Sequence, residues 1–234
     1  MKKITKKMQF MHTLVKNKKN FDIEEGIELL KKMAISKFNE SIDVSINLSI
    51  NPKKSDQNIR GSTVLPHGIG KIIKVAVFTQ EKNFEIAKKC GAEYVGLHDL
   101  IEKIQKNNID FNIAIASVDV MHFVNKLGPV LGPRGLMPNT KLGTVTNDIK
   151  TAIKNAKIGQ INYKNDKNGI IHTSIGKINF LNKNIQENLH VLLKSLKRLK
   201  PKTLKGSYIK KITLSTTMSL GININFNNLN YVVI

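Results

Sequence analysis

The segment 67–71, with the sequence HGIGK, joins two glycines to a lysine, which are the residue types that hold phosphate in nucleotide-binding loops. Its spacing does not fit a P-loop. The first glycine of that motif would fall at Leu65, and Ile72 stands where a metal-binding serine or threonine is needed. The glycine fingerprint of dinucleotide-binding folds is also missing after the apolar run 72–78. A nucleotide-binding enzyme is therefore a disfavoured alternative function.

Histidine and cysteine, the other common sources of site chemistry, give no metal-binding pattern. The histidines are His12, His67, His98, His122, His172 and His190, and none pairs with another at the helical spacing of metal ligands. The single cysteine, Cys90, excludes an intramolecular disulfide and a multi-cysteine metal site. We therefore expect no metal, no cofactor and no small-molecule substrate.

The stretch from Leu127 to Val145 has an unusual composition. It contains Gly128, Pro129, Gly132, Pro133, Gly135, Pro138 and Gly143. Because proline fixes φ and lacks an N–H, we expect neither helix nor strand to run through this stretch. Its apolar side chains predict an ordered loop that holds the guanidinium of Arg134 at its tip. A purely structural connection between two elements is an equally favoured alternative.

The formal net charge of +21 indicates a polyanionic partner, with nucleic acid favoured over an anionic membrane. The nearest approach to a membrane-surface helix is 185–200, but its leucines favour packing on a sheet. A hydrophobic share of 41% supports a packed core, and no run is long enough for a transmembrane helix. The basic N-terminal twenty residues lack a signal-peptide pattern, so we expect a cytoplasmic protein.

The first and last thirds of the chain read as an α+β domain. Asp22 and Glu25 predict a capped helix start, and 41–50 alternates strictly between apolar and polar residues, as a strand with one wet face does. Later elements are expected as strands at 161–164 and 170–175 around a hairpin loop, a helix from Ile185 ended by Pro201, and strands at 208–217 and 222–226.

The middle of the chain reads differently, because its strands are apolar on both faces. Such strands are expected at 72–78, 94–95 and 113–116, and helices at 81–89, 99–106, 118–126 and 147–157, the last capped by Thr146 or Asn147. This alternation predicts Rossmann-like βαβ units on a parallel sheet that is covered on both faces.

The change of pattern predicts two domains. An outer, discontinuous α+β domain with an antiparallel-type sheet would combine 1–67 and 159–234, and an inner α/β domain would be inserted at 68–158. Two strand-like crossings would form a hinge, with Pro66, His67, Gly68 and Gly70 on one and Gly159 on the other.

Five motifs of this chain occur in one order in a known family. They are SDQNIRGSTVLPHGIGK at 55–71, GAEYVG at 91–96, LGPRGLMPN at 131–139, GIIHTSIGK at 169–177 and STTM at 215–218. With them the chain resembles, over nearly its whole length, the L-one family of large-subunit ribosomal proteins, which are proteins of the mobile ribosomal stalk.

The resemblance implies a structural constituent of the large ribosomal subunit that is a monomer outside the ribosome. It would bind the stalk region of large-subunit rRNA, assist release of deacylated tRNA from the exit site, and repress translation of its own mRNA. The RNA-binding residues implied or expected are Lys37, Phe38, Ser41, His172, Lys177, Ser215, Thr216, Thr217 and Met218. Basic residues expected to face tRNA are Lys53, Lys54, Arg60, Lys164, Lys167 and Arg134.

The residues by themselves leave alternatives open. Phe38 would otherwise be a core aromatic under the Ile42 face, His172 an ordinary surface histidine beside Lys164 and Lys177, and 215–218 a strand end. The chain also departs from the family pattern at Pro129, Thr140, Thr173, Ser174, Ser219 and Leu220. Ser219 and Leu220 stand where the family has Gly-Pro, so the backbone shape after Met218 is the open question.

Overall fold

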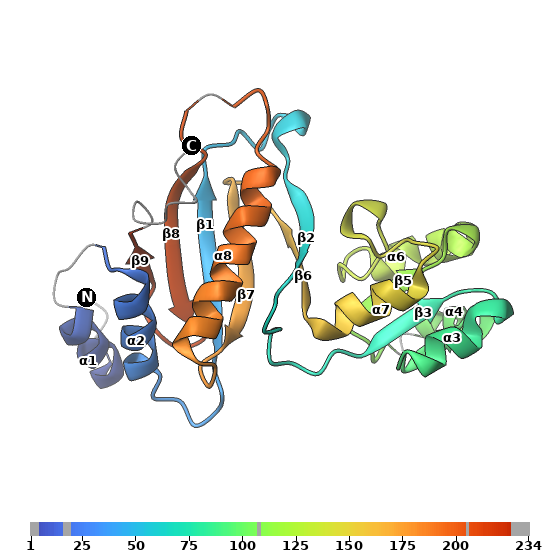
Figure 1. Ribbon diagram of the computed structural model, residues 1–234, viewed down its shortest axis with the longest axis horizontal. Helices are drawn as coiled ribbons and strands as arrows, with labels where there is room; N and C mark the ends of the chain where they lie inside the picture. Colours follow the sequence, from blue (N-terminus) through green and yellow to red (C-terminus); the bar gives the residue numbers. More distant parts are fainter. Residues whose placement is uncertain (1–4, 16–19, 107–108, 205, 226–234) are drawn as a thin grey trace. The chain divides into compact units, whose positions relative to one another are not determined.

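The computed structural model describes residues 5–15, 20–106, 109–204 and 206–225 (Figure 1). The chain forms two compact units. The discontinuous unit comprises Met1–Gly70 with Tyr163–Ile234, and the inserted unit comprises Lys71–Asn162. The first contains an antiparallel sheet and the second a parallel sheet, which confirms the predicted combination of α+β and α/β architecture.

The discontinuous unit is built on a four-stranded sheet in the order β7-β1-β8-β9. The strands are β1 (Ser41–Leu48), β7 (Ile170–Lys177), β8 (Ile209–Thr216) and β9 (Ile222–Ile224), all antiparallel to their neighbours. The predicted alternation in β1 is confirmed, because its even-numbered residues are buried and its odd-numbered residues are half-buried. One face of the sheet is therefore apolar and the other polar.

Helices cover the apolar face. α2 (Ile23–Met33) packs against β8 and β9, and α8 (Asn182–Arg198) packs against β7, crossing the sheet in Figure 1. Leucines of α8 such as Leu189 and Leu192 are fully buried, so this helix belongs to the core and not to a membrane surface. α1 (Lys6–Val15) packs on α2. Asp22 occupies the N-cap of α2, but its side chain does not make the expected capping hydrogen bond.

A separate two-stranded ribbon pairs β2 (Arg60–Val64) with β6 (Gln160–Lys164), and a short 3-10 helix, η1 (Ser55–Gln57), precedes β2. The predicted hairpin between β6 and β7 is present only at its tip, where Asn165 and Ile171 form an isolated antiparallel bridge. Beyond that bridge the two strands diverge and join different sheets.

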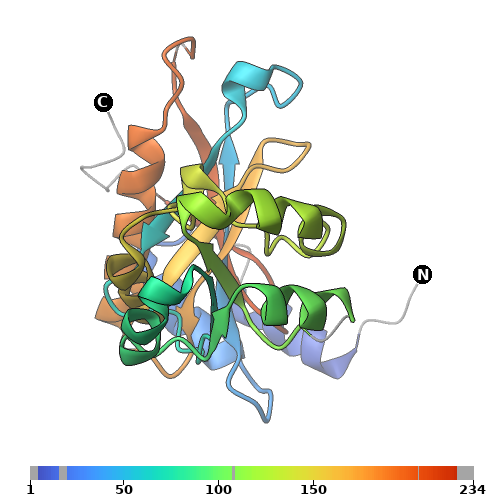
Figure 2. The same ribbon diagram turned by 90° about the vertical axis from the view of Figure 1, so that its right-hand side faces the viewer.

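The inserted unit has a three-stranded parallel sheet in the order β4-β3-β5, with β4 at Tyr94–Gly96, β3 at Val75–Phe78 and β5 at Ile113–Ala116. All four residues of β3 are buried, as predicted for a strand covered on both faces. η2 (Glu81–Asn83) leads into α3 (Phe84–Lys89), which lies with α7 (Ile149–Ile158) on one face. α4 (His98–Gln105), η3 (Val118–Val120) and α5 (Met121–Val124) lie on the other face. Figure 2 shows the teal and olive helices on one side of the strands and the green and yellow-green helices on the other.

The glycine- and proline-rich stretch corrects one expectation, because helical turns do form inside it. The one-turn helix α6 (Gly128–Leu131) and η5 (Thr140–Leu142) fall there, and η4 (Asn125–Leu127) ends at its first residue. Pro129 is tolerated because it lies in the first turn of α6, where its missing N–H would have no partner. Leu131 is buried while Arg134 is exposed, so an ordered segment does carry an outward guanidinium.

The start of α7 also differs from the prediction. Asp148 is the N-cap, and its carboxylate accepts hydrogen bonds from the Thr151 N–H at 3.2 Å and the Thr151 hydroxyl at 2.5 Å. Thr146 instead accepts the N–H of Asp148 at 3.1 Å. Within the described ranges, no helix is both long and apolar enough to cross a bilayer.

Candidate nucleic-acid interface

Three segments that are distant in sequence meet at one end of the antiparallel sheet. We call residues 36–41, 177–178 and 215–219 the three-segment patch. The N–H of Ile178 donates to the carbonyl of Glu40 at 3.1 Å, and the Lys177 ammonium donates to the Ser41 hydroxyl at 2.7 Å. The Ser41 N–H donates to the Thr217 hydroxyl oxygen at 3.2 Å, which closes the link to the third segment.

Apolar side chains stand out from this patch. Phe38 is 55% exposed and Met218 is 54% exposed, with Ile35 nearby in sequence at 53%. Phe38 is therefore not the core aromatic of the alternative interpretation. Lys37 and Thr217 are exposed as well, so the patch combines an aromatic ring, a thioether, a hydroxyl and an ammonium. That set is suited to bases, riboses and phosphates.

The turn that carries Thr217 and Met218 is closed by the side chain of Ser219. The Ser219 hydroxyl accepts the Thr216 N–H at 2.9 Å and donates to the Leu220 carbonyl at 3.1 Å. The Ser219 N–H also reaches the Thr216 carbonyl at 3.3 Å. Where the family pattern has Gly-Pro, this chain thus uses a hydroxyl to shape the turn.

Not every predicted RNA-binding residue offers its side chain to solvent. Thr216 is only 4% exposed and pairs with Ile42 on the buried face, so its side chain is part of the core. The Lys177 ammonium is engaged by Ser41 and, at 3.4 Å, by the Asn39 carbonyl, so it links strands within the patch. Ser215 is half-buried on the polar face, opposite Asp43 of β1.

Glu40 was missed by the sequence analysis and lies at the centre of the patch. It is 1% exposed, and its Oε2 accepts the Met218 N–H at 3.0 Å. Burial by itself raises the pKa of Glu40. Contacts with the hydroxyls of Ser36 and Thr216, the Met218 N–H and the charge of Lys7 outweigh burial, so the pKa lies below its ordinary value. The carboxylate is ionised at neutral pH.

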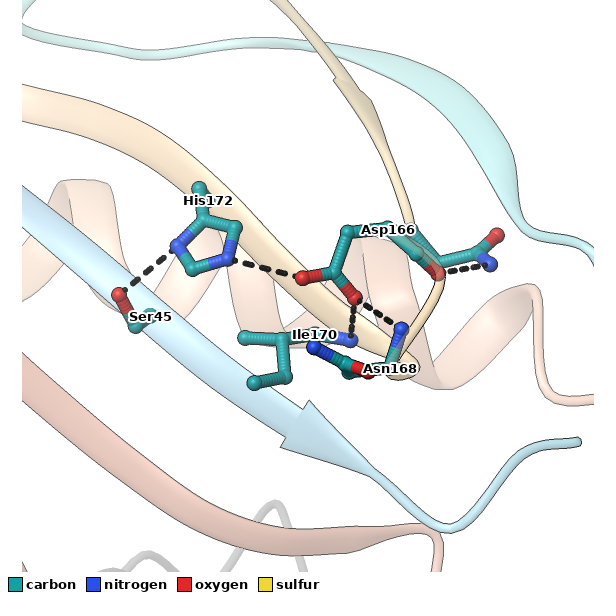
Figure 3. Close-up of polar contacts among 6 residues, drawn as sticks. Ser45, Asp166, Asn168, Ile170 and His172 are labelled. Atoms are coloured by element: carbon teal, nitrogen blue, oxygen red, sulfur yellow. Dashed lines mark hydrogen bonds and ion pairs between the residues drawn. The ribbon is translucent and has the colours of Figure 1, made fainter. Parts of the chain in front are cut away.

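The polar face of the sheet begins beside the patch and carries His172. The His172 ring lies between Ser45, at 3.1 Å from Nδ1, and Asp166, at 3.4 Å from Nε2 (Figure 3). Its hydrogen-bond partners are therefore this serine and this aspartate. Asp166 Oδ1 also accepts the N–H groups of Asn168 and Ile170, both at 2.8 Å, which lowers the pKa of Asp166.

Serine, histidine and aspartate in a row resemble the groups of a hydrolase triad, but the surroundings do not support catalysis. Ser45 lies in the middle of β1, opposite His172 on one side and Thr213 on the other. The backbone of β1 is thus paired along both edges, whereas an oxyanion hole needs free N–H groups beside the nucleophile. His172 is also 58% exposed. The arrangement instead fixes an imidazole for surface hydrogen bonding.

Exposed basic side chains gather at the opposite end of the sheet. Lys53 and Lys54 follow β1, Arg60 begins β2, Lys164 ends β6 and Lys167 lies in the hairpin loop, all of them exposed. The two loops are joined, because the Leu48 N–H donates to the Gly169 carbonyl at 3.1 Å and the Ile59 N–H to Asn165 Oδ1 at 2.7 Å. We call these five residues the basic end. Arg134 lies apart from them, in the inserted unit.

The hinge candidates occupy a turn and a helix end, so the expectation of two strand-like crossings is wrong. Pro66 and His67 form a turn closed by the Gly68 N–H to the Leu65 carbonyl at 3.1 Å. Asn188 of α8 holds this turn: its Oδ1 accepts the His67 N–H, and its Nδ2 donates to the Gly68 carbonyl at 3.1 Å.

Two further hinge candidates, Gly70 and Gly159, are glycines with positive φ. At Gly70, where φ is +71°, a Cβ would come within 2.9 Å of Lys177 Cγ, so this residue is seated on the discontinuous unit. At the second crossing, Ile158 ends α7 and Gly159 is its C-cap, with φ at +130°. These contacts hold residues 66–70 on the discontinuous unit, and the hinge stays a prediction.

Residues 30–220 match the ribosomal protein L1p/L10e family. The chain belongs to this family. The large ribosomal subunit protein uL1 of Buchnera aphidicola subsp. Baizongia pistaciae (strain Bp) is 64% identical over 230 residues, covering 98% of this chain and 99% of that protein. The protein of the same name from Buchnera aphidicola subsp. Acyrthosiphon pisum (strain Tuc7) is 58% identical over 229 residues, with coverages of 98% and 99%.

Membership in the L1p/L10e family confirms the resemblance inferred from the sequence motifs. It also confirms the expectation of a ribosomal protein that is not an enzyme, located at the ribosome in the cytoplasm. The three-segment patch and the basic end lie entirely within the matched residues 30–220, as do strands β1, β7 and β8 between them.

Proposed function

We propose that the chain is a constituent of the large ribosomal subunit that binds the stalk region of large-subunit rRNA through the three-segment patch. The observation that carries this proposal is the exposure of Phe38 and Met218 on segments tied together by hydrogen bonds. Exposed apolar side chains held on a rigid, polar-edged surface indicate a binding partner. The relatives are named large ribosomal subunit protein uL1, which supports the same assignment.

The charge distribution supports RNA as the partner of the discontinuous unit. Residues 1–70 and 163–234 contain 25 lysines and arginines against 9 aspartates and glutamates, whereas 71–162 contain 13 against 8. Most of the excess positive charge therefore lies in the unit that carries the patch. Phosphate neutralisation by these side chains would make the affinity depend strongly on salt concentration.

The proposed mechanism is recognition of a folded RNA by a preformed surface. Phe38 would stack on a base or ribose, and Thr217 and Met218 would lie in a minor groove, where 2′-hydroxyls and base edges are accessible. Lys37 would neutralise a phosphate, and His172 and Ser41 would donate or accept at riboses on the polar face. Because hydrogen bonds already connect the three segments, little ordering entropy is lost on binding.

We further propose that the basic end contacts deacylated tRNA leaving the exit site. The five basic side chains of that end lie on joined loops at the end of the sheet away from the patch, so one protein can face two RNAs. Arg134 in the inserted unit is a sixth candidate for this contact. The third proposed activity, repression of translation of its own mRNA, would use the same patch, because a message that mimics the rRNA site would compete for one surface.

Affinity for a stalk rRNA fragment, measured over a range of salt concentrations, tests the proposal. The monomeric protein should bind the fragment, Phe38→Ala should weaken binding at every salt concentration, and Lys37→Ala should also reduce the slope against log salt by about one. Competition by the chain's own mRNA leader tests the repressor activity. Wild-type protein with no preference for the stalk fragment over an unrelated hairpin would refute the proposed function.

A further inference from the structure

Glu40 is an acidic residue inside a surface proposed to bind a polyanion, and the proposed contacts do not use it. We propose that Glu40 is a positioning residue for RNA binding, whose buried carboxylate holds the 216–219 turn in the form that presents Thr217 and Met218. This inference rests on the proposed function of the three-segment patch.

The contacts of Glu40 reach all three segments. Its side chain accepts the Met218 N–H at 3.0 Å, its backbone carbonyl accepts the Ile178 N–H at 3.1 Å, and the next N–H, that of Ser41, donates to Thr217. At 1% exposure the carboxylate cannot touch RNA itself. Its effect on RNA must therefore pass through the backbone that it holds.

A buried carboxylate is costly unless donors compensate for the lost water, so its retention here needs a reason. The hydroxyls of Ser36 and Thr216 face it closely enough to favour its charged form, although Oε1 and the Thr216 hydroxyl stop short of full hydrogen-bond geometry. The Met218 N–H is the donor with full geometry. An ionised acceptor makes a stronger hydrogen bond to a backbone N–H than a neutral one does.

Two side chains thus accept N–H groups of the 216–219 turn. The Ser219 hydroxyl accepts a hydrogen bond from the Thr216 N–H at 2.9 Å, and the Glu40 carboxylate accepts one from the Met218 N–H. With both held, the exposed side chains of Thr217 and Met218 project from a fixed backbone. The negative charge of Glu40 beneath them also disfavours a phosphate at the turn, so we expect ribose and base edges to contact it.

The test combines hydrogen exchange of the Met218 amide, followed by NMR, with affinity for the stalk rRNA fragment across salt concentrations. Glu40→Leu keeps volume and removes the acceptor, and Glu40→Gln keeps an acceptor oxygen. We expect Glu40→Leu to speed exchange at Met218 by about tenfold and to weaken binding by about tenfold. The salt slope should stay unchanged, because no phosphate contact is lost. Glu40→Gln should stay within about threefold of wild type in both measurements.

Asn39→Ala, at the exposed neighbouring position, is the control for exchange and should leave the Met218 amide protected. If Glu40→Leu does not fold, Glu40→Asp withdraws the carboxylate by one methylene and should give the same pattern at smaller amplitude. Unchanged exchange and affinity in these variants, or a reduced salt slope like that of Lys37→Ala, would overturn the inference. If wild-type protein binds no RNA, the proposed function fails, and exchange at Met218 alone decides whether Glu40 holds the turn.

Discussion

Ser41 and Thr217 lie 176 positions apart in the chain and meet in a hydrogen bond of 3.2 Å from the Ser41 N–H to the Thr217 hydroxyl oxygen. The bond joins the start of β1 to the residue that follows β8. Thr217 therefore has a structural partner inside the protein as well as a proposed role toward RNA. A substitution of Thr217 would therefore remove both the hydrogen bond to Ser41 and the proposed contact with RNA.

Phe38→Ala should weaken binding of the stalk rRNA fragment by about 1–3 kcal/mol, the usual value of one aromatic stacking contact. Its stability should change little, because the ring is 55% exposed. Phe10→Ala removes another exposed phenyl ring, 47% exposed on α1, and should leave affinity unchanged. A large fall in melting temperature with intact affinity would show that Phe38 acts in packing.

Thr217→Ala and Met218→Ala should reduce rRNA affinity, whereas Lys53→Ala and Lys167→Ala should mainly affect binding of tRNA or have little effect. The first pair lies on the turn held by Glu40 and Ser219, and the second pair lies at the basic end. Affinities of all four variants for rRNA and for deacylated tRNA separate the two surfaces. Equal losses of rRNA affinity in all four would contradict this partition.

The discontinuous unit should bind rRNA without the inserted unit. Residues 1–70 joined through a short glycine linker to 159–234 retain β6 and its partner β2, and should keep most of the affinity. Closing such a short loop adds an entropic term on the order of 1 kcal/mol. Circular dichroism establishes folding before the affinity is measured. A folded shortened chain with no affinity would move the RNA site to the inserted unit.

Asn188→Ala should lower the free energy of unfolding by about 2–4 kcal/mol, because it leaves buried backbone groups without partners. Asn188 is fully buried and contacts the His67 N–H, the Gly68 carbonyl and the Ile175 carbonyl. Urea unfolding measures the effect, and Lys194→Ala, exposed on the same helix, is the control. An equal effect of both substitutions would mean that Asn188 does not hold the turn before the proposed hinge.

The parts of the fold that the sequence predicted well are those with a repeating apolar pattern. In β1 apolar and polar residues alternate because one face is buried, and in β3 all residues are apolar because both faces are buried. The sequence therefore predicts both strands correctly. The N-cap at Asp148 was missed because three adjacent residues, Thr146 to Asp148, can all cap a helix, and only the backbone path selects one.

The candidate site was harder to predict, since its geometry depends on contacts over long sequence separations. Phe38 and Thr216 were both assigned to RNA, but the register that places Thr216 opposite Ile42 buries it. A single acidic residue between Asn39 and Ser41 is ordinarily interpreted as a surface residue. The one signal available was its place at the start of a wet-faced strand, on the side of the buried residues.

The strand order β7-β1-β8 also has a consequence for the growing chain. β1 is made first, and both of its neighbours come from beyond residue 169, after the whole inserted unit has been synthesised. The inserted unit is contiguous and can fold while β1 still has two open edges. The patch is then assembled last, so an unfinished chain cannot occupy an RNA site. Proteolysis of ribosome-bound chains arrested near residue 200, when 71–162 has left the exit tunnel and β8 is not yet made, should find β1 cleaved and 71–162 protected.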